Sequence, residues 1–504
     1  MSKKLISLFM VVIMALSVFS CGLMSVNAED TEDTTTSQVE DTTTIQSEEI
    51  TTQEDEETTT ELSSEPAFEP VSEPTTEPVT ETTTKPPVQV GLVKQIKALY
   101  PSTVSFSLAV KQTRKITVSV LPADAKNKSI KWSTSNAKVA TVSQSGVVQG
   151  VSVGKAQITA TAADSSGKRL VFTVNIVARR KGTYFSAADM KTVNVWDAKY
   201  CYKDMKSDLE KLKAKYPELF TYSSMGKTYD NRNIYEVVVG NKDAKKHMIV
   251  QATMHAREYI NSLLVMRQLE CICANYYTGT YNGMYYSEIF DKVCLHIVPM
   301  VNPDGVAISQ YGLNGISNAK LRNNAKKLCK KYGKGKKTYY TRWKANARGV
   351  DLNRNYPLNF KKKKTINHYN NEMYKGPYAA SEKETVIMMN QIKRVKPKVV
   401  LSYHSTGSII YRDFSQPKAL AKKNNQLFSV VHKLTGYRAA RSSGSGLKVG
   451  PCYGDWVGYA NKIPTLTIET GKSAAPVNIK EFPTIWNQNK NVIPAAALWA
   501  INNM

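Results

Sequence analysis

The chain has 504 residues, 42% hydrophobic and 22% charged, which is enough for two or more globular domains. Its 68 Lys and Arg outnumber its 42 Asp and Glu, giving a formal net charge of +26. Seven cysteines are too few for a disulfide-stapled scaffold. After the first residues no stretch is apolar enough to span a bilayer, so we expect no transmembrane helix.

Residues 1–28 have the order of an export signal. Two lysines precede an apolar stretch that ends at Phe19, and small residues follow. Two cleavage sites remain open. Val-Asn-Ala ending at Ala28 fits an ordinary signal peptidase, whereas Val-Phe-Ser-Cys ending at Cys21 resembles a bacterial lipobox, which would leave that cysteine lipid-anchored. We therefore expect a protein that is secreted or held at the cell surface or wall.

Residues 29–90 consist largely of Thr, Glu, Pro and Ser, which predicts a disordered linker. Eighteen of the acidic residues lie between 29 and 85 with one lysine, so the rest of the chain is strongly basic. Behind an export signal, this charge favours attraction to an anionic cell wall and argues against nucleic acid as a partner. A lysine-rich surface without any partner explains the charge equally well.

Residues 91–178 contain short alternating segments separated by Asn, Ser and Gly turns, a pattern that predicts a small β-sandwich. The stretch KWSTSNAKVATVSQSGVVQGVSVGKAQITATA resembles bacterial Ig-like domains of group 2. The resemblance implies a spacer or a surface-adhesion module and assigns no catalytic residue.

Residues 183–504 alternate between predicted helices and strands. KDMKSDLEKLKAKYPELF is amphipathic and should end near Pro217, and residues 259–277 should form a second helix. Buried strands are expected at IYEVVVG, KHMIVQAT, VCLHIVPMVN, KPKVVLSYH and IPTLTIET. This alternation predicts one α/β domain with a mixed, largely parallel sheet flanked by helices.

Four residues with metal or acid–base chemistry fall at the ends of these strands. His255 and Glu258 follow one strand, His404 ends another and Glu469 ends a third. Open α/β sheets bind ligands at the carboxyl ends of their strands, and zinc hydrolases combine His and carboxylate ligands with a base. Taken singly, each has a plainer explanation, such as a chance H-x-x-E or an exposed strand end.

Residues 348–355 read RGVDLNRN, and an Asn-Arg pair on a loop can hold a carboxylate because guanidinium is a planar bidentate donor. An ordinary polar turn is the alternative. Together MHAREYI, VPMVNPDGV, RGVDLNRNYP, SYHSTG and PTLTIETG resemble, in this order, the zinc carboxypeptidases of the M14 family over roughly residues 195–500. The resemblance implies one zinc ion bound by His255, Glu258 and His404, Glu469 as general acid/base, and substrate contacts from Asn353, Arg354 and Arg257.

The family also uses an arginine that stabilises the oxyanion. Lys344 stands where that arginine is expected, after Trp343, and we take the nearby Arg348 as the catalytic candidate with Lys344 as the alternative. The family's mobile tyrosine corresponds to Tyr453 or Tyr437, and of these we place Tyr453 at the substrate.

Gly454 occupies the place of the family's pocket-floor residue and has no charge to select a basic side chain. Several segments resemble bacterial members that cut wall stem peptides at γ-D-glutamyl–diaminopimelate bonds. His-Ala-Arg-Glu differs from the His-Gly-Asn-Glu of that branch, so the sequence favours a broad-specificity exported carboxypeptidase equally or slightly more. The alternative from another class is an inactive surface or wall-binding protein. We favour the enzyme because every expected site residue is present.

Overall fold

The computed structural model describes residues 98–101, 104–412, 417–440 and 450–504. The predicted export signal at 1–28, the predicted linker at 29–90 and the lipid-anchor candidate Cys21 lie outside the described residues. Within them, no helix combines the length and the apolar character needed to cross a membrane. The six cysteines that the structure describes are free thiols.

The segment from Ala98 to Val177 is all-β, as its alternating pattern predicts. A four-stranded sheet in the order β2-β9-β8-β5 and a three-stranded sheet in the order β3-β7-β6 share one core, in which Ile158 and Phe172 are fully buried. Gly146 has φ +78°, and a Cβ there would lie 2.8 Å from the ring of Trp132, so this turn requires glycine. The strands are β1 (Ala98–Pro101), β2 (Ser105–Ala109), β3 (Thr113–Lys115), β4 (Val118–Leu121), β5 (Ile130–Thr134), β6 (Ala140–Val142), β7 (Val147–Gly150), β8 (Gly154–Ala162) and β9 (Arg169–Val177).

The α/β part is built on an eight-stranded sheet in the order β10-β11-β15-β12-β16-β19-β17-β18. The four central strands are parallel to one another, while β10, β11 and β17 pair antiparallel, so the predicted mixed sheet is confirmed. Its strands are β10 (Phe220–Lys227), β11 (Asn233–Val239), β12 (Lys246–Ala252), β15 (Val293–Val298), β16 (Val399–Ser405), β17 (Ile409–Tyr411), β18 (Arg438–Ala439) and β19 (Thr465–Thr470), and a separate hairpin pairs β13 (Thr280–Tyr281) with β14 (Met284–Tyr285).

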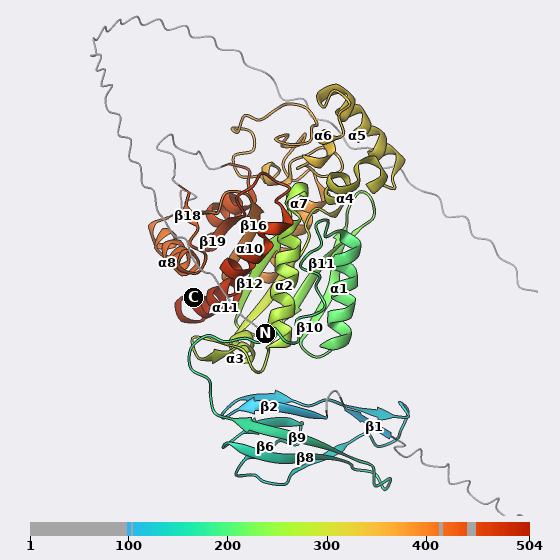
Figure 1. The fold of residues 1–504 in the computed structure, drawn as a ribbon, viewed down its shortest axis with the longest axis vertical. Helices are drawn as coiled ribbons and strands as arrows, with labels where there is room; N and C mark the ends of the chain where they lie inside the picture. The colour runs from blue at the N-terminus through green and yellow to red at the C-terminus, as the bar shows by residue number, and fades with distance from the viewer. Residues whose placement is uncertain (1–97, 102–103, 413–416, 441–449) are drawn as a thin grey trace, which may run out of the picture. The chain divides into compact units, whose positions relative to one another are not determined.

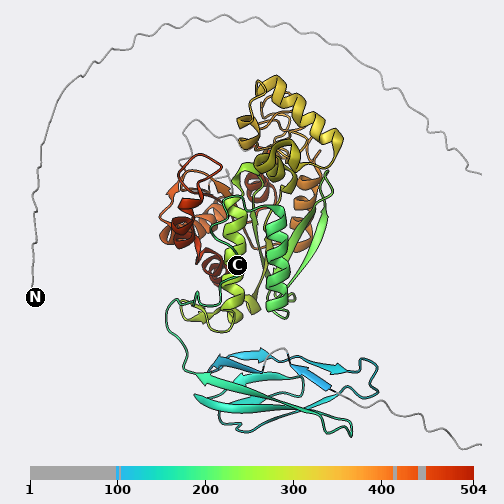
Figure 2. The ribbon, with the colours of Figure 1, turned by 45° about the vertical axis from the view of Figure 1, so that its right-hand side comes forward.

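Helices cover both faces of this sheet (Figures 1 and 2). The longer ones are α1 (Tyr202–Lys215), α2 (Ile260–Ala274), α3 (Tyr286–Lys292), α4 (Pro303–Tyr311), α5 (Ala319–Tyr332), α7 (Lys383–Val395), α8 (Lys418–Thr435), α10 (Phe482–Asn489) and α11 (Val492–Asn503). The short ones are α6 (Thr338–Thr341), α9 (Tyr453–Asp455), η1 (Ala256–Glu258), η2 (Gly312–Gly315), η3 (Leu352–Arg354), η4 (Trp456–Ala460) and η5 (Ile479–Glu481).

Alternation along the central strands decides which helix packs on which face. In β12, Met248 and Val250 join the larger core with α1, α2 and α11, while Ile249 joins the smaller core with α7. Because both faces are covered, the middle of the strand, Met248–Val250, is apolar on both faces, as parallel strands commonly are. Helix α1 ends at Lys215, close to the predicted stop at Pro217.

Candidate metal centre and active site

The carboxyl ends of β12, β16 and β19 lie at one edge of the sheet because these strands are parallel neighbours. His255 follows β12 by three residues. His404 and Glu469 lie near the ends of β16 and β19 and are direct partners in the strand register. The topology therefore brings together three segments that are separated by more than sixty residues in the sequence, at the edge where α/β sheets bind ligands.

A tight turn carries the chain from β12 to His255. Thr253 has φ +58°, a left-handed conformation that a β-branched residue adopts only when its surroundings enforce it. Its hydroxyl lies 2.8 Å from the Ser262 hydroxyl and 3.3 Å from the carbonyl oxygen of Glu258, which fixes the turn. The short helix η1 then places Glu258 three residues after His255, on the same side of the backbone.

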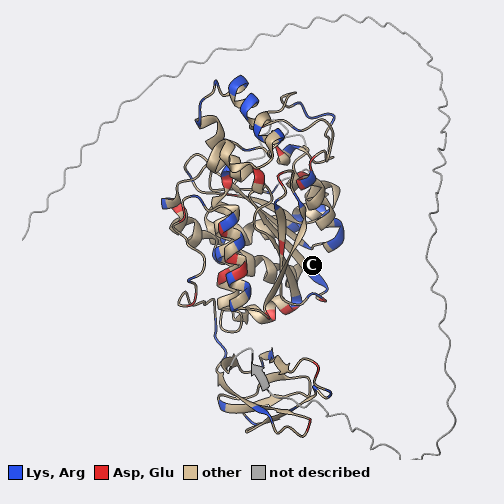
Figure 3. Cartoon of the chain, turned by 90° about the vertical axis from the view of Figure 1, so that its right-hand side faces the viewer, with Lys and Arg blue, Asp and Glu red and all other residues tan. Residues whose placement is uncertain are grey.

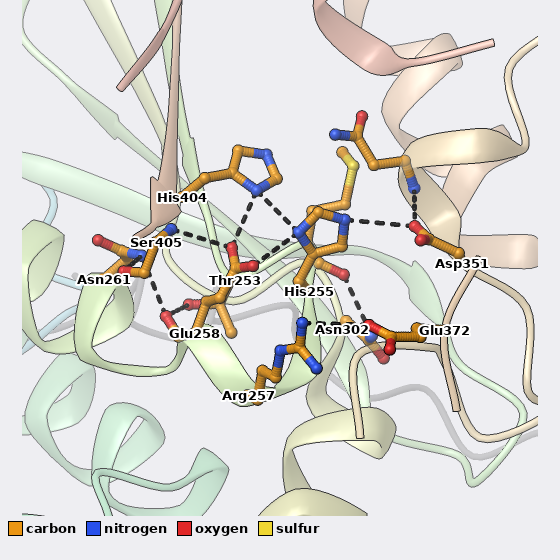
Figure 4. A network of polar contacts seen from close by, with 12 residues as sticks. Thr253, His255, Arg257, Glu258, Asn261, Asn302, Asp351, Glu372, His404 and Ser405 are labelled. Carbon is orange, nitrogen blue, oxygen red and sulfur yellow. Dashed lines mark hydrogen bonds and ion pairs between the residues drawn. The ribbon is translucent and has the colours of Figure 1, made fainter. Parts of the chain in front are cut away.

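Figure 4 shows the side chains of His255, Glu258 and His404 pointing at one another. The two Nδ1 atoms of the histidines lie 3.0 Å apart. Glu258 Oε1 lies 2.9 Å from His255 Nδ1, and Glu258 Oε2 lies 2.9 Å from His404 Nδ1. All three side chains are buried, with residue exposures of 4%, 2% and 1% for His255, Glu258 and His404.

This cluster fits a zinc ion. Two imidazole nitrogens and a carboxylate oxygen are the ligand set that catalytic zinc takes in proteins, with a fourth position left for water. Each Nδ1 atom lies near a carboxylate oxygen of Glu258 and near the other Nδ1 atom. If both Nδ1 atoms donate to Glu258, neither has a lone pair left to accept from the other, so hydrogen bonds alone cannot account for all three contacts. A cation at their common centre satisfies all three groups.

The surroundings favour an ionised Glu258 and a neutral His255. Burial alone would raise the pKa of Glu258, but the two histidines beside it outweigh burial and hold that pKa below its usual range. Burial lowers the pKa of His255, so its ring stays neutral and keeps a lone pair for a metal. The backbone N–H of Ser405 also donates to Glu258 Oε2 at 3.1 Å, which fixes the carboxylate.

Asp351 is a site residue to which the sequence analysis assigned no role. Its Oδ1 lies 3.2 Å from Nε2 of His255, on the far side of the ring from the cluster, and Asp351 is fully buried. Metal-binding histidines commonly donate their second N–H to a carboxylate in this way, which fixes tautomer and ring orientation. The available signal was an acidic residue inside RGVDLNRN, next to residues already assigned to the site.

Glu469 lies beside the cluster on β19. Burial raises its pKa, the charge of Glu258 raises it further, and His404 and Lys344 oppose both, leaving the pKa of Glu469 at about 7. A carboxyl group with a pKa near neutrality can both accept and return a proton at physiological pH. This is the behaviour required of a general acid/base.

Asn353 and Arg354 lie on η3, directly after Asp351, which caps that helix through the N–H of Asn353 at 3.1 Å. Asn353 Oδ1 accepts the Tyr453 N–H at 2.9 Å, and Arg354 Nη1 lies 3.3 Å from the sulfur of Cys452. One short segment therefore carries both the carboxylate that orients His255 and the pair expected to bind the substrate.

Arg257 is directed toward a neighbouring loop. Its Nη1 donates to the carbonyl oxygen of Arg342 at 3.0 Å, and its Nη2 pairs with the Glu372 carboxylate at 3.1 Å (Figure 4). A substrate contact from Arg257 would therefore compete with an existing ion pair.

The two oxyanion candidates occupy different surroundings. The carbonyl oxygen of Lys344 accepts a hydrogen bond from the Ala256 N–H at 3.0 Å. The positive charge of Lys344 acts to lower the pKa values of His255, His404 and Glu469, although it is not the largest influence on any of them. The structure thus brings Lys344 to the cluster.

Arg348 Nη1 donates to the Tyr229 hydroxyl at 2.8 Å, and Nη2 donates to the Tyr369 hydroxyl at 3.3 Å. Its Nε lies 3.8 Å from the buried carboxylate of Glu382. Among the residues that the structure describes, none of its polar contacts is to a member of the metal cluster. The expected catalytic placement of Arg348 is therefore not supported by its surroundings.

Neither tyrosine candidate has the surroundings of a mobile residue. Tyr453 is fully buried and packs against Tyr356, with ring centres 5.3 Å apart, and Tyr437 is fully buried and accepts a hydrogen bond from Asn489 at 2.9 Å.

Tyr411, which the sequence analysis missed, is 38% exposed on β17 and shares a sheet face with Glu469. Burial and the charge of Glu469 raise the pKa of Tyr411. Gly454, the proposed pocket-floor residue, follows Tyr453 on α9 and is also buried.

Family models match both parts of the chain. Residues 205–491 match the family described as Zinc carboxypeptidase (Peptidase_M14), and residues 93–172 match Bacterial Ig-like domain (group 2). Both matches confirm the resemblances seen in the sequence. The zinc carboxypeptidase match spans more than half of the chain.

Named relatives show the same relationship. The chain is 27% identical over 292 residues to gamma-D-glutamyl-L-diamino acid endopeptidase 1 of Lysinibacillus sphaericus, covering 57% of this chain and 70% of that protein. It is 22% identical over 295 residues to metallocarboxypeptidase A of Trichophyton rubrum, and the match covers 55% of this chain and 64% of that protein.

Two solved structures are also similar. Carboxypeptidase A from Helicoverpa armigera covers 60% of this chain and 74% of its own, with 18% identity and a TM-score of 0.45. The match to murein-tripeptide amidase from Escherichia coli O157 covers 55% of this chain and 91% of that chain, with 17% identity and a TM-score of 0.34. With a buried His-Glu-His cluster, a neighbouring glutamate and a family match over most of the α/β part, the chain belongs to the zinc carboxypeptidase family, which it joins to a bacterial Ig-like domain.

Proposed function

We propose that this protein is an exported zinc metallocarboxypeptidase that hydrolyses γ-D-glutamyl–diamino acid bonds in cell-wall stem peptides. One zinc ion per chain is bound by His255, Glu258 and His404. The observation that carries the proposal is the convergence of these three buried side chains within 3.0 Å of one another, with Glu469 on the adjacent strand. A decayed enzyme has no reason to keep this arrangement intact.

The reaction follows from the residues around that centre. Zinc, when bound, supplies a Lewis acid for the water and for the scissile carbonyl. The Glu469 carboxylate accepts a proton from the attacking water and later returns it to the departing amine nitrogen. The ammonium group of Lys344 stabilises the negative charge that develops on the carbonyl oxygen, the role first expected of Arg348. Asn353 and Arg354 hold the carboxylate of the departing residue.

The stem-peptide substrate is supported by the named relative and by the site. The Lysinibacillus sphaericus relative is named for action on gamma-D-glutamyl-L-diamino acid. In a stem tripeptide, the residue after the γ-glutamyl bond ends in a free carboxylate, which suits Asn353 and Arg354. Gly454 offers no charge that would restrict the enzyme to lysine or arginine.

A general carboxypeptidase is the second candidate. Arg257 follows Ala256 in the metal motif and pairs with Glu372, unlike the His-Gly-Asn-Glu expected of the stem-peptide branch. The Asn353–Arg354 pair suits any peptide with a free carboxyl terminus. The relative from Trichophyton rubrum is named a metallocarboxypeptidase.

Retention at an anionic wall is supported by basic surface features. Helix α5, at the top of the molecule in Figures 1 and 3, carries six lysines and arginines and no acidic residue. Beside it lies a cavity of about 920 Å³ whose lining includes Lys320, Lys327 and Arg348 with Tyr229 and Tyr369. Phosphate or carboxylate polymers suit such a surface. An Ig-like domain ahead of the catalytic part is consistent with a protein that acts at the cell surface.

The test uses the chain from residue 29 onward, loaded with zinc, and two substrates. One is a muropeptide stem that contains diaminopimelate, and the other is a plain peptide with a hydrophobic last residue. Mass spectrometry should show cleavage of the stem at the γ-D-glutamyl bond, absent with Glu469→Gln. Cleavage of the plain peptide alone would establish the general carboxypeptidase. Stoichiometric zinc with neither substrate cut would support the inactive, wall-binding alternative.

A further inference from the structure

A second group of metal-binding side chains lies at the opposite ends of the central strands. His247 and Cys294 are the second residues of β12 and β15, and His296 lies two residues after Cys294 in β15. One donor atom from each of the three residues lies within 4.8 Å of those from the other two. The seven residues of β12, at about 3.3 Å per residue, separate this group from the catalytic cluster by roughly 20 Å.

The strand register explains why the three side chains meet. β12 and β15 are parallel neighbours in which His247 is opposite Cys294. His296 is two residues further along β15 and so faces the same side of the sheet as Cys294. Nδ1 of His247 and Nε2 of His296 are 2.9 Å apart, nearly the same separation as the two catalytic histidine nitrogens at 3.0 Å.

His296 is oriented by a carboxylate in the manner of a metal ligand. Its Nδ1 lies 3.0 Å from Glu236 Oε1 on β11. Glu236 is itself held by two side chains of α7, with Gln391 donating at 2.8 Å and Arg394 at 2.7 Å. A carboxylate paired with an arginine accepts, so Nδ1 of His296 donates and its Nε2 keeps a lone pair directed at the group. His255 and Asp351 show the same relation at the catalytic centre.

A hydrogen-bonded histidine pair would explain the two rings and leave the third member without a role. Cys294 is fully buried, His296 is 5% exposed, and His247 is half-buried, so one side of the group is open to an arriving ion. Two imidazoles and a thiol on one sheet face, with a carboxylate behind one imidazole, form a ligand set for a borderline-soft cation.

We propose that His247, Cys294 and His296 form a second metal site that binds Zn²⁺ or a chemically similar divalent ion. The ion joins β12 to β15 at the end of the sheet away from the catalytic centre, and water fills its fourth position. Binding replaces the thiol proton of Cys294, which passes to solvent. Tetrahedral zinc with Zn–N bonds of about 2.1 Å separates two nitrogens by about 3.4 Å. The rings therefore need to part by about half an ångström, as do those of the catalytic cluster.

The site can be tested with Co²⁺ because, of the two ligand groups in the described part of the chain, this one contains a thiol and the catalytic one does not. The chain from residue 29 onward is stripped with a chelator and titrated with Co²⁺, while bound metal and the near-ultraviolet thiolate-to-cobalt charge-transfer band are recorded. We expect two Co²⁺ per chain and a band that saturates with one of them. Cys294→Ser should lose the band and one Co²⁺ while keeping peptidase activity.

Three further variants make the result specific. Cys271→Ser changes another buried thiol and should keep the band and both ions. Glu258→Gln disables the catalytic cluster and should keep the band. His247→Gln alters the half-buried ligand, where the risk to folding is smallest, and should lose one ion. One Co²⁺ per chain without a thiolate band, or a band that survives Cys294→Ser, would overturn the proposal. A band lost only with Cys452→Ser would place the thiolate beside Arg354 instead.

Discussion

His255 Nε2 lies 3.2 Å from Asp351 Oδ1, so the ring that faces the metal position with one nitrogen is held from behind by a buried carboxylate. Burial raises the pKa of Asp351, but His255, Lys344 and Arg354 together outweigh burial and hold that pKa below its usual range. The carboxylate is therefore ionised and lies within ion-pair distance of Nε2, which favours the tautomer that carries its proton on Nε2. This leaves Nδ1 of His255 unprotonated and aimed at Glu258 and His404.

Replacing Asp351 with asparagine should weaken zinc binding. The amide keeps the shape of the side chain but loses the charge that favours the Nε2-protonated ring, and loss of such a partner typically lowers metal affinity by about 10- to 100-fold. Competition with a chromophoric chelator measures the change. Asp291→Asn, at an exposed residue, serves as the control. Unchanged affinity in Asp351→Asn would show that the contact does not orient the ligand.

The Lys344 assignment is tested by a matched pair of variants. Lys344→Met should lower kcat by about 10²- to 10³-fold, the usual effect of removing one oxyanion-stabilising group. Arg348→Met should leave kcat nearly unchanged because its guanidinium is engaged by Tyr229 and Tyr369. Steady-state assays on one substrate compare the two. The opposite ranking would restore the expectation that Arg348 is catalytic.

The sequence predicts the proposed zinc ligands and Glu469 because each lies at or just after the end of an apolar strand, and parallel strands bring their carboxyl ends to one edge. It does not show where Arg348 points. Asn346 accepts hydrogen bonds from the N–H groups of Arg348 and Val350, at 3.1 Å each, and forms a turn that carries Arg348 away from Lys344. Such a turn depends on side-chain hydrogen bonds that no hydrophobic pattern records.

The surroundings of the candidate tyrosines could not be read from the sequence for a related reason. Tyr453 and Tyr437 are close in sequence to site segments, yet both rings are fully buried in the cores beneath the sheet edge. Tyr411 reaches Glu469 through the antiparallel pairing of β17 with β19, which joins segments more than fifty residues apart. The register of two short edge strands cannot be deduced from their composition.

Loss of Arg354 should affect the binding of the substrate's terminal carboxylate. A hydrogen bond to a charged group contributes roughly 1.5–3 kcal/mol, so Arg354→Met should raise KM by about 10- to 100-fold for a substrate with a free carboxylate. The same substrate with an amidated terminus should be a poor substrate for the natural protein and little changed by the substitution. If both substrates lose activity equally, Arg354 supports the fold of η3 and does not bind the carboxylate.

The pH dependence of kcat/KM should have an acidic limb set by Glu469. Burial and then the charge of Glu258 raise the pKa of Glu469 to about 7, and a bound zinc cation acts in the opposite direction. Activity requires the deprotonated carboxylate, so it should fall as the pH decreases through a value at or below about 7.

Lys344 provides the internal check on this assignment. Its positive charge lowers the pKa of Glu469, so Lys344→Met should move the acidic limb to higher pH, whereas Arg348→Met should leave it in place. Rate profiles for the three proteins, measured at constant ionic strength, decide the point. A limb that stays fixed in Lys344→Met would mean that another group controls it.

Glu384 on α7 should make the folded protein less stable as the pH rises. Burial raises its pKa to about 8, and the charges of Asp304 and Glu382 contribute in the same direction. The unfolded chain releases this proton near pH 4.5 while the folded chain retains it to about pH 8, so between these values the free energy of unfolding falls by roughly 1.4 kcal/mol per pH unit.

Glu384→Gln removes this dependence because the amide stays neutral at every pH. It can keep the hydrogen bond from Asn346, which reaches Glu384 Oε2 at 3.3 Å. Urea denaturation at about pH 5 and about pH 8 should show the variant gaining stability over the natural protein as the pH rises. Glu210→Gln, at an exposed position on α1, should show no such trend. A constant difference at both pH values would mean that Glu384 is ionised in the folded protein.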